Sequence, residues 1–135
     1  MRQRRHYNLM IVEDNPGDAV LIKDAFSSKS NISSVNVFSD GETAISFLKS
    51  DCLREPERRP DLILLDLNLP GGNGRDILKQ IKSNEKFKFI PVVVLTSSDH
   101  EEDLKTVYSE GANAYVRKPI DADHFFNVIG EIQSF

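Results

Sequence analysis

The sequence has little that would place it in a membrane, in a secretory compartment or on nucleic acid. Cys52 is the only cysteine, so no intramolecular disulfide can form and a reducing compartment is indicated. No apolar run approaches the roughly 18 residues that a membrane-spanning helix needs, and residues 9–12 are too few for a signal-peptide core. The net charge is −4 and the pI is near 5.4, which argues against a general nucleic-acid surface. These absences predict a soluble, cytoplasmic protein that binds neither membrane nor nucleic acid.

Transition-metal ligands and room for a second domain are also missing. The three histidines, His6, His100 and His124, share no ligand spacing, which argues against a transition-metal site. A chain of 135 residues with 39% hydrophobic and 28% charged residues suits one ordinary globular domain. We therefore expect residues 1–135 to form a single domain with no DNA-binding or catalytic output domain.

Short apolar runs alternate with helical patterns five times along the chain. The runs predict strands at residues 7–13, 35–38, 61–66, 91–95 and 114–117, each followed by a helix. Such alternation favours an α/β fold in which helices cover both faces of a parallel sheet. Right-handed crossovers permit the doubly wound, flavodoxin-like strand order 2-1-3-4-5, with its switch point between the first and third strands.

The segments between the strands carry further signals. Asp40 is placed to cap the second helix, and residues 54–60, rich in proline, glutamate and arginine, predict an exposed loop. In the first helix, four apolar residues recur at helical spacing and are expected to face the sheet: Leu21, Ile22, Ala25 and Phe26.

Acidic residues stand at the ends of the first and third predicted strands. Glu13 and Asp14 follow the first apolar run, and Asp66 ends the third. If these strands are parallel neighbours, three carboxylates converge at one edge of the sheet. They repel one another unless a cation neutralises them or protons are taken up. The pattern therefore predicts an acidic metal pocket.

A hydroxyl and an amine stand at the ends of the fourth and fifth strands. Thr96 follows the apolar run at residues 91–95, and Lys118 follows the run at 114–117. The three acids, the hydroxyl and the amine would therefore share one crevice, which is suited to receiving a phosphoryl group. Simpler structural explanations stay open for these residues. Glu13, Asp14 and Thr96 could cap helices, and Lys118 could be an ordinary surface lysine.

Over essentially its whole length the chain resembles the receiver domain of two-component response regulators. The resemblance rests on the pair Glu13-Asp14, residues 66–70 with Gly74 beyond them, Thr96-Ser97, and Tyr115 followed by Lys118-Pro119. Each match alone is weak, but together, in this order and at strand ends, they are highly specific. The turn at residues 15–18, the insertion at 54–60 and the stretches 64–70 and 90–96 look like the stand-alone regulators encoded beside bacterial phytochromes.

The resemblance implies that Asp66 is the phosphoacceptor of a Mg²⁺-dependent reaction. Asp14, Asp66 and the main-chain carbonyl of Asn68 would ligate the ion, and Glu13 would act through a coordinated water. Mg²⁺ suits this set because it prefers few carboxylates, retained waters and phosphate oxygens. Many members of the family have aspartate where Glu13 stands, so this chain departs from the pattern there.

The resemblance also implies a conformational switch. Lys118 and Thr96 would contact phosphoryl oxygens, and Tyr115 would fill the space that Thr96 vacates on moving toward the phosphoryl group. The Lys118–Pro119 bond matches one that the family holds cis. The switch would remodel the surface formed by the fourth helix, the strand at 114–117 and the final helix.

These inferences together predict a single-domain response regulator. Asp66 would accept a phosphoryl group from the phosphohistidine of a sensor histidine kinase, phytochrome-like if the subfamily resemblance holds. The signal would pass by protein contacts to a downstream protein, or through a homodimer across the switch surface. The protein would not be an enzyme beyond slow self-dephosphorylation.

Three other functions compete with this interpretation. An aspartyl-phosphate phosphatase needs a second acid two residues beyond the nucleophile, where this chain has Asn68. A flavin or nucleotide carrier should offer glycines and hydroxyls in its first loop, where Glu13 and Asp14 would repel phosphate. A receiver that binds partners without phosphorylation is disfavoured because the full set of site residues is present.

Overall fold

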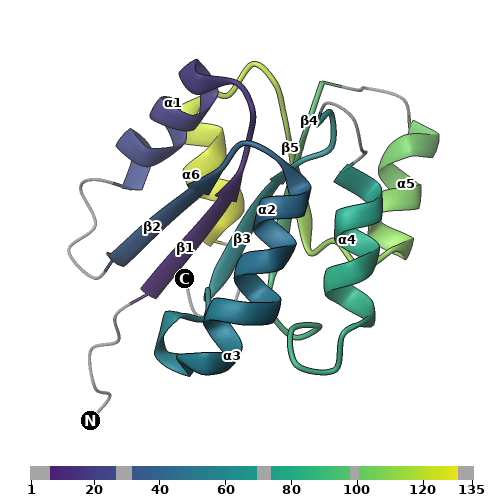
Figure 1. The fold of residues 1–135 in the computed structure, drawn as a ribbon. Helices are drawn as coiled ribbons and strands as arrows, with labels where there is room; N and C mark the ends of the chain where they lie inside the picture. Colours follow the sequence, from purple (N-terminus) through teal and green to yellow (C-terminus); the bar gives the residue numbers. More distant parts are fainter. Residues whose placement is uncertain (1–6, 27–31, 70–73, 98–100, 131–135) are drawn as a thin grey trace, which may run out of the picture.

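The computed structural model describes residues 7–26, 32–69, 74–97 and 101–130, and within these ranges it confirms the predicted sheet. The five strands pair in parallel in the order β2-β1-β3-β4-β5 (Figure 1). β1 therefore lies between β2 and β3, which puts the topological switch point between β1 and β3. Their bounds are β1 (Tyr7–Val12), β2 (Ile32–Phe38), β3 (Leu62–Asp66), β4 (Val92–Thr96) and β5 (Ala114–Arg117).

Helices follow each strand and cover both faces of the sheet. α1 and α6 lie behind the sheet in Figure 1, and α2 to α5 lie in front of it. The second predicted helix is one continuous helical segment, in which a π turn, η1, separates α2 from α3. The helical elements are α1 (Pro16–Phe26), α2 (Gly41–Ser46), η1 (Phe47–Asp51), α3 (Cys52–Arg54), the 3₁₀ turn η2 (Pro56–Arg58), α4 (Gly74–Ser83), α5 (Glu101–Ser109) and α6 (Ala122–Gly130).

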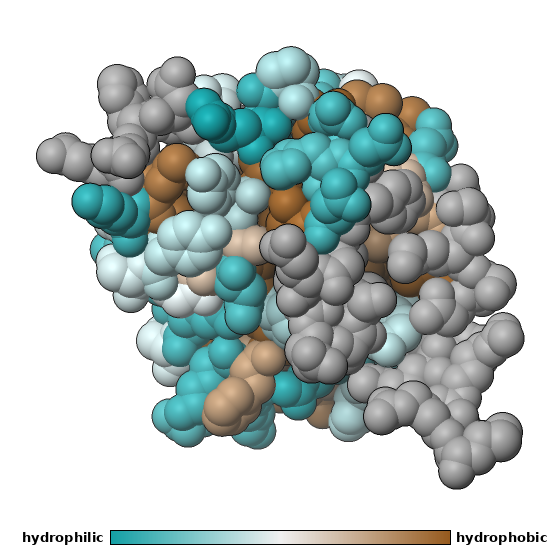
Figure 2. Space-filling model, turned by 180° about the vertical axis from the view of Figure 1, so that it is seen from behind, coloured by the Kyte–Doolittle hydropathy of each residue, from teal (hydrophilic) through white to brown (hydrophobic). Residues whose placement is uncertain are grey.

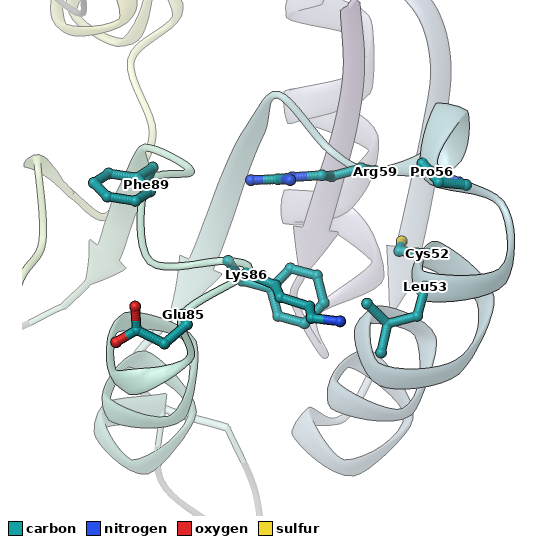
Figure 3. A pocket seen from close by; sticks show the side chains of 8 residues that line it. Cys52, Leu53, Pro56, Arg59, Glu85, Lys86 and Phe89 are labelled. Carbon is teal, nitrogen blue, oxygen red and sulfur yellow. The ribbon is translucent and has the colours of Figure 1, made fainter.

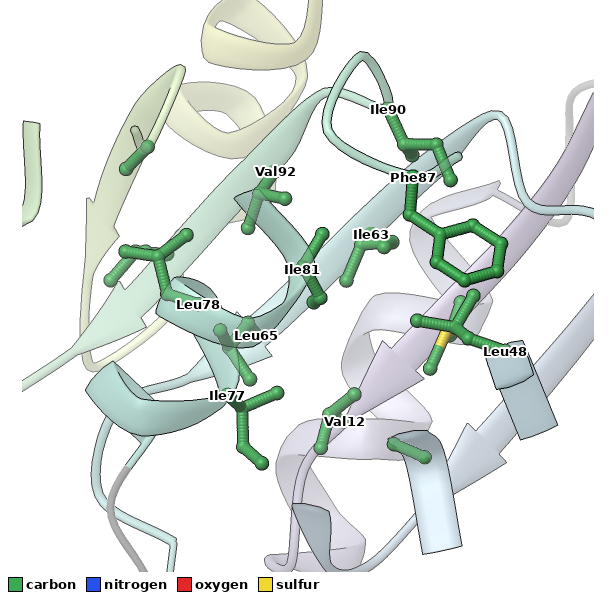
Figure 4. Packing of buried hydrophobic residues seen from close by; sticks show 14 of the residues in the cluster. Val12, Leu48, Ile63, Leu65, Ile77, Leu78, Ile81, Phe87, Ile90 and Val92 are labelled. Carbon is green, nitrogen blue, oxygen red and sulfur yellow. The ribbon is translucent and has the colours of Figure 1, made fainter. Parts of the chain in front are cut away.

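Side chains of the central strands alternate between two hydrophobic clusters, as the pleat requires. In β1, Leu9 and Ile11 pack with α1 and α6, whereas Met10 and Val12 face the helices on the other side. Figure 4 shows the second cluster, where residues of β1, β3 and β4 meet those of α4 and of the segment before β4. Burial on both faces explains why β3 and β4 read as unbroken apolar runs.

Of two local predictions, the helix cap at Asp40 is confirmed and the buried position of Leu21 is not. Asp40 caps α2 as predicted, because its Oδ1 accepts a hydrogen bond from Thr43 N at 2.7 Å. The prediction that Leu21 is buried is wrong, since its side chain is 51% exposed. α1 begins at Pro16, and the residues that it buries recur at spacings of three and four: Ala19, Ile22 and Phe26.

The surface is mixed in character. Figure 2 shows hydrophilic side chains over most of the coloured part of the back face, with apolar residues in separate small areas. Helix α1 exposes two aliphatic side chains, Val20 at 55% and Leu21 at 51%. In the part of the chain that the structure describes, every helix is too short or too polar to span a bilayer.

Candidate functional site

The parallel register brings the predicted site residues to one edge of the sheet. Val12 pairs with Leu65, Asp66 with Leu95, and Thr96 with Arg117. The strands therefore end nearly level, and the residues at or just after their carboxyl ends lie together.

Three carboxylates converge at this edge, as the sequence predicted. One oxygen each from Glu13, Asp14 and Asp66 lies within 4.8 Å of the others. Glu13 and Asp66 are buried, with exposed fractions of 2% and 1%, whereas Asp14 is exposed. Two buried carboxylates beside a solvent-facing third form an acidic cluster that an ion can reach from water.

Lys118 lies inside this acidic cluster. Its Nζ is 2.9 Å from Glu13 Oε1 and 3.4 Å from Asp66 Oδ2. It also lies 3.0 Å from Oδ2 of Asp18, in the first turn of α1. Burial by itself would lower the pKa of Lys118, but the surrounding carboxylates outweigh burial and raise it, so the ammonium stays charged. The Lys118–Pro119 peptide bond is cis, a question that the sequence alone left open.

A single lysine leaves Glu13 incompletely stabilised. Burial raises the pKa of Glu13 to about 7, with the Lys118 hydrogen bond opposing the rise and Asp66 adding to it. Oε1 of Glu13 is buried, and although Lys118 Nζ lies close, no donor in the described ranges is aligned to give this oxygen a hydrogen bond. A divalent cation with its coordinated waters fits such a site, because the donors are hard oxygen atoms with surplus negative charge.

The turn after β1 holds Glu13 and Asp18 in place. Glu13 N donates to Phe38 O at 2.9 Å, and Glu13 Oε2 accepts from Asn15 N at 3.1 Å. Asn15 Oδ1 in turn accepts from Asp18 N at 3.0 Å, which fixes the first turn of α1 beside Lys118. The turn after β1 and the first turn of α1 therefore place Glu13 and Asp18 next to Lys118.

The end of β3 is tied to the end of β4. Asp66 Oδ1 accepts from Asn68 N at 2.9 Å, and Asn68 Oδ1 accepts from Ser97 Oγ at 3.3 Å. Thr96 is 1% exposed, and its carbonyl accepts from Lys118 N at 2.8 Å. Asp66, Thr96 and Lys118 are thus positioned by backbone hydrogen bonds as well as by the sheet.

Tyr115 lies on β5, half-buried against the cluster that faces α2 to α5. Its ring meets that of Tyr108 on α5 edge to face, with 5.8 Å between centroids and 74° between planes. The predicted switch aromatic therefore joins strand β5 to helix α5.

Two contacts of the site were missed by sequence reasoning. Asp18 was interpreted only as the start of the first helix, yet it pairs with Lys118. Ser97 was matched to the family without a predicted contact to Asn68, yet its hydroxyl donates to the Asn68 side chain. An acid one turn after Glu13-Asp14 is the only signal that could have suggested Asp18.

Gly74 is a steric requirement of the site. A Cβ atom there would overlap the carbonyl oxygen of Asp66 and the Cα of Leu67. We expect Gly74→Ala to lower the free energy of unfolding by about 1–3 kcal/mol, because the Asp66–Leu67 backbone must shift. Gly17→Ala is the control, since its Cβ meets only Asn15 Oδ1 at 3.2 Å. Urea denaturation of both variants measures the difference, and equal stabilities would contradict this account.

The chain was compared with known proteins. The family model described as response regulator receiver domain matches residues 9–130. Response regulator Rcp1 of Synechocystis sp. is 37% identical over 127 residues, which cover 94% of this chain and 86% of Rcp1.

Two solved structures are similar to this fold. The Mn²⁺-bound form of Rcp1 is 37% identical, with a TM-score of 0.78 over 96% of this chain and 93% of that one. The phosphorylated cyanobacterial phytochrome response regulator RcpA is 38% identical, with a TM-score of 0.77 over 92% of this chain and 89% of that one. The predicted resemblance to phytochrome-associated regulators is confirmed.

Proposed function

Because the chain belongs to the response regulator receiver domain family, we propose that Asp66 is the residue that carries the phosphoryl group in its signalling reaction. The observation that supports this choice most directly is the position of Asp66. It is buried, it contacts Lys118, and it shares a 4.8 Å cluster with two further carboxylates.

The proposed reaction is a direct transfer. A carboxylate oxygen of Asp66 attacks phosphorus of a phosphohistidine, the new O–P bond forms as the N–P bond breaks, and the imidazole nitrogen leaves with the electron pair. The donor is a sensor histidine kinase, and the relation to a phytochrome regulator favours a phytochrome-like one.

A divalent metal would be held by the acidic cluster, and we propose Mg²⁺. Asp14, Asp66 and the main-chain carbonyl of Asn68 are the proposed ligands, with Glu13 acting through a coordinated water. When bound, the ion neutralises charge on the phosphoryl oxygens. Mn²⁺ bound to the related Rcp1 supports a divalent site of this kind.

Lys118 and Thr96 are proposed to contact the phosphoryl oxygens once transfer is complete. Lys118 already reaches Asp66, and Thr96 ends the neighbouring strand. Movement of Thr96 would let Tyr115 shift inward, and the ring contact would carry this shift to Tyr108. The output surface would then be α5, β5 and α6, open to a downstream protein or a second copy.

Incubation with acetyl phosphate and Mg²⁺, followed by intact mass, tests the proposed function. We expect one phosphoryl adduct per chain, because a single aspartate has the required surroundings. A chain that gains no adduct with this donor or with a phosphorylated histidine kinase would contradict the proposal.

Mg²⁺ affinity should fall as the pH is lowered through 7. The pKa of Glu13 is raised to about 7, so acidification protonates this carboxyl and removes negative charge from the site. If protonation of Glu13 prevents Mg²⁺ binding completely, the ion binds about tenfold more weakly at pH 6 than at pH 8. Isothermal titration calorimetry across this range measures the effect. Glu13→Gln should flatten the dependence, and an unchanged slope in that variant would contradict the role of Glu13.

A further inference from the structure

A groove lies at the opposite end of the sheet from Asp66. Its walls precede β3 and β4, at their amino-terminal ends, whereas the phosphorylation site follows their carboxyl ends. The groove has a volume of about 410 Å³, within the range of protein binding pockets (Figure 3). It is lined by Cys52, Leu53, Pro56, Arg59, Glu85, Lys86, Phe87 and Phe89.

Hydrogen bonds hold both walls of this groove in place. On one side, Asn8 Nδ2 on β1 donates to the carbonyl of Arg59 at 3.0 Å. On the other, Lys82 Nζ donates to the carbonyls of Lys88 at 3.1 Å and Ile90 at 2.8 Å. The groove is therefore formed before any partner arrives, and binding would require little ordering of the chain.

Apolar side chains are exposed at the groove. Phe89 is 77% exposed, more than any other large hydrophobic residue in the described ranges, and Leu53 on α3 is 44% exposed. Phe87 and Cys52 beneath them are buried. Exposed aromatic and aliphatic groups around a preformed hollow are typical of a protein-binding surface.

Positive charge faces the groove from both walls. Figure 3 shows Arg59 and Lys86 extending toward the hollow from opposite sides. Neither side chain is in an ion pair with any residue that the structure describes. The one acid in the lining, Glu85, is paired with Lys88 at 3.1 Å. The lining thus carries two cations outside these ion pairs and one acid that is paired with a lysine, a positive balance that favours a ligand with carboxylates.

We propose that this groove binds a segment of a partner protein in which an aromatic or branched aliphatic side chain is flanked by carboxylates. The apolar side chain packs on Phe89 and Leu53, and the carboxylates contact Arg59 and Lys86. Because the groove and Asp66 lie at opposite ends of the strands, the partner remains bound while Asp66 gains or loses a phosphoryl group. One end of the sheet thus binds the partner protein, and the opposite end carries the phosphorylation site.

Selection from a displayed library of short random peptides tests this proposal. Wild-type protein should enrich sequences in which aspartate or glutamate flanks an aromatic or branched aliphatic residue. The peptide with the highest affinity should then bind Phe89→Ser and the double variant Arg59→Glu, Lys86→Glu at least about tenfold more weakly, a loss typical of an interface hot spot. All three substitutions are at exposed positions, so unchanged circular dichroism spectra are expected for both variants.

Matched controls on α1 separate this groove from general surface effects. Val20→Ser removes an aliphatic side chain that is 55% exposed, and Lys23→Glu reverses an exposed charge. Both should bind the selected peptide within about twofold of wild type, as surface changes remote from an interface do. Acetyl phosphate treatment should likewise leave its affinity unchanged.

Several results would overturn the proposal. One is that the selected peptides lack acidic residues. Another is that Phe89→Ser binds the selected peptide as tightly as the wild-type protein does. A dimer in sedimentation that Phe89→Ser dissociates would identify a second copy of this chain as the occupant, which also overturns it. None of these results depends on whether Asp66 accepts a phosphoryl group.

Discussion

Asp66→Asn should gain no phosphoryl group from acetyl phosphate under conditions that fully label the wild-type protein. The amide lacks the anionic oxygen that attacks phosphorus, and the other carboxylates of the site cannot replace it because they project from other elements. Intact mass spectrometry in the presence of Mg²⁺ measures the loss, which should be complete within detection.

Asp66→Asn should lose phosphorylation without unfolding the protein. Asparagine has nearly the same shape, and it removes one of the negative charges that crowd around Lys118, so thermal stability without metal should be equal or higher. Asp18→Asn is the matched control, because Asp18 also contacts Lys118 but lies outside the cluster of three carboxylates. It should still be labelled. A normal adduct on Asp66→Asn would show that another residue is the acceptor.

Mg²⁺ should raise the melting temperature of the wild-type protein substantially. Binding at about one hundred times the dissociation constant stabilises a folded protein by about 2.7 kcal/mol. For a chain of this size that corresponds to a rise of about 10 °C in a circular dichroism melt. Asp14→Asn should lose most of the rise, because Asp14 is a proposed direct ligand of the ion and supplies one of the three carboxylates of the cluster.

Asp123→Asn provides the control for overall charge. Asp123 is an exposed acid in the first turn of α6, so this variant makes the same change in net charge without touching the acidic cluster. It should keep the full response to Mg²⁺. An equal rise in Asp14→Asn, or an equal rise with sodium chloride at matched ionic strength, would contradict a specific site.

The sequence predicted the sheet and the acidic hollow because both depend on repeating patterns. β3 and β4 are unbroken apolar runs, and in a parallel sheet the residues that follow such runs must lie at one edge. Placing Glu13 and Asp66 side by side therefore required only the strand order.

Features that depend on exact helix phase could not be predicted in the same way. α1 begins two residues before the expected Asp18 and packs on the sheet through Ala19, Ile22 and Phe26, which leaves Leu21 facing outward and Asp18 beside Lys118. β2 begins at Ile32, earlier than the predicted residue 35, because an edge strand needs no continuous apolar run.

The groove around Phe89 was also beyond sequence reasoning. It is formed by two segments about thirty residues apart, and neither carries a recognisable motif. Residues 54–60 were predicted only as an exposed loop. Their 3₁₀ turn and their hydrogen bonds to Asn8 become visible only when the strands are placed next to one another.

The crowding around Lys118 has a consequence for when the protein can respond. Its one ammonium group faces Glu13, Asp18 and Asp66, so the carboxylate cluster keeps a negative surplus that repels an incoming phosphate. In the proposed reaction, a divalent cation must offset that repulsion before a phosphodonor reaches Asp66. If Asp66 is phosphorylated in this way, the supply of free divalent ions sets a threshold below which kinase activity alone leaves the protein unphosphorylated.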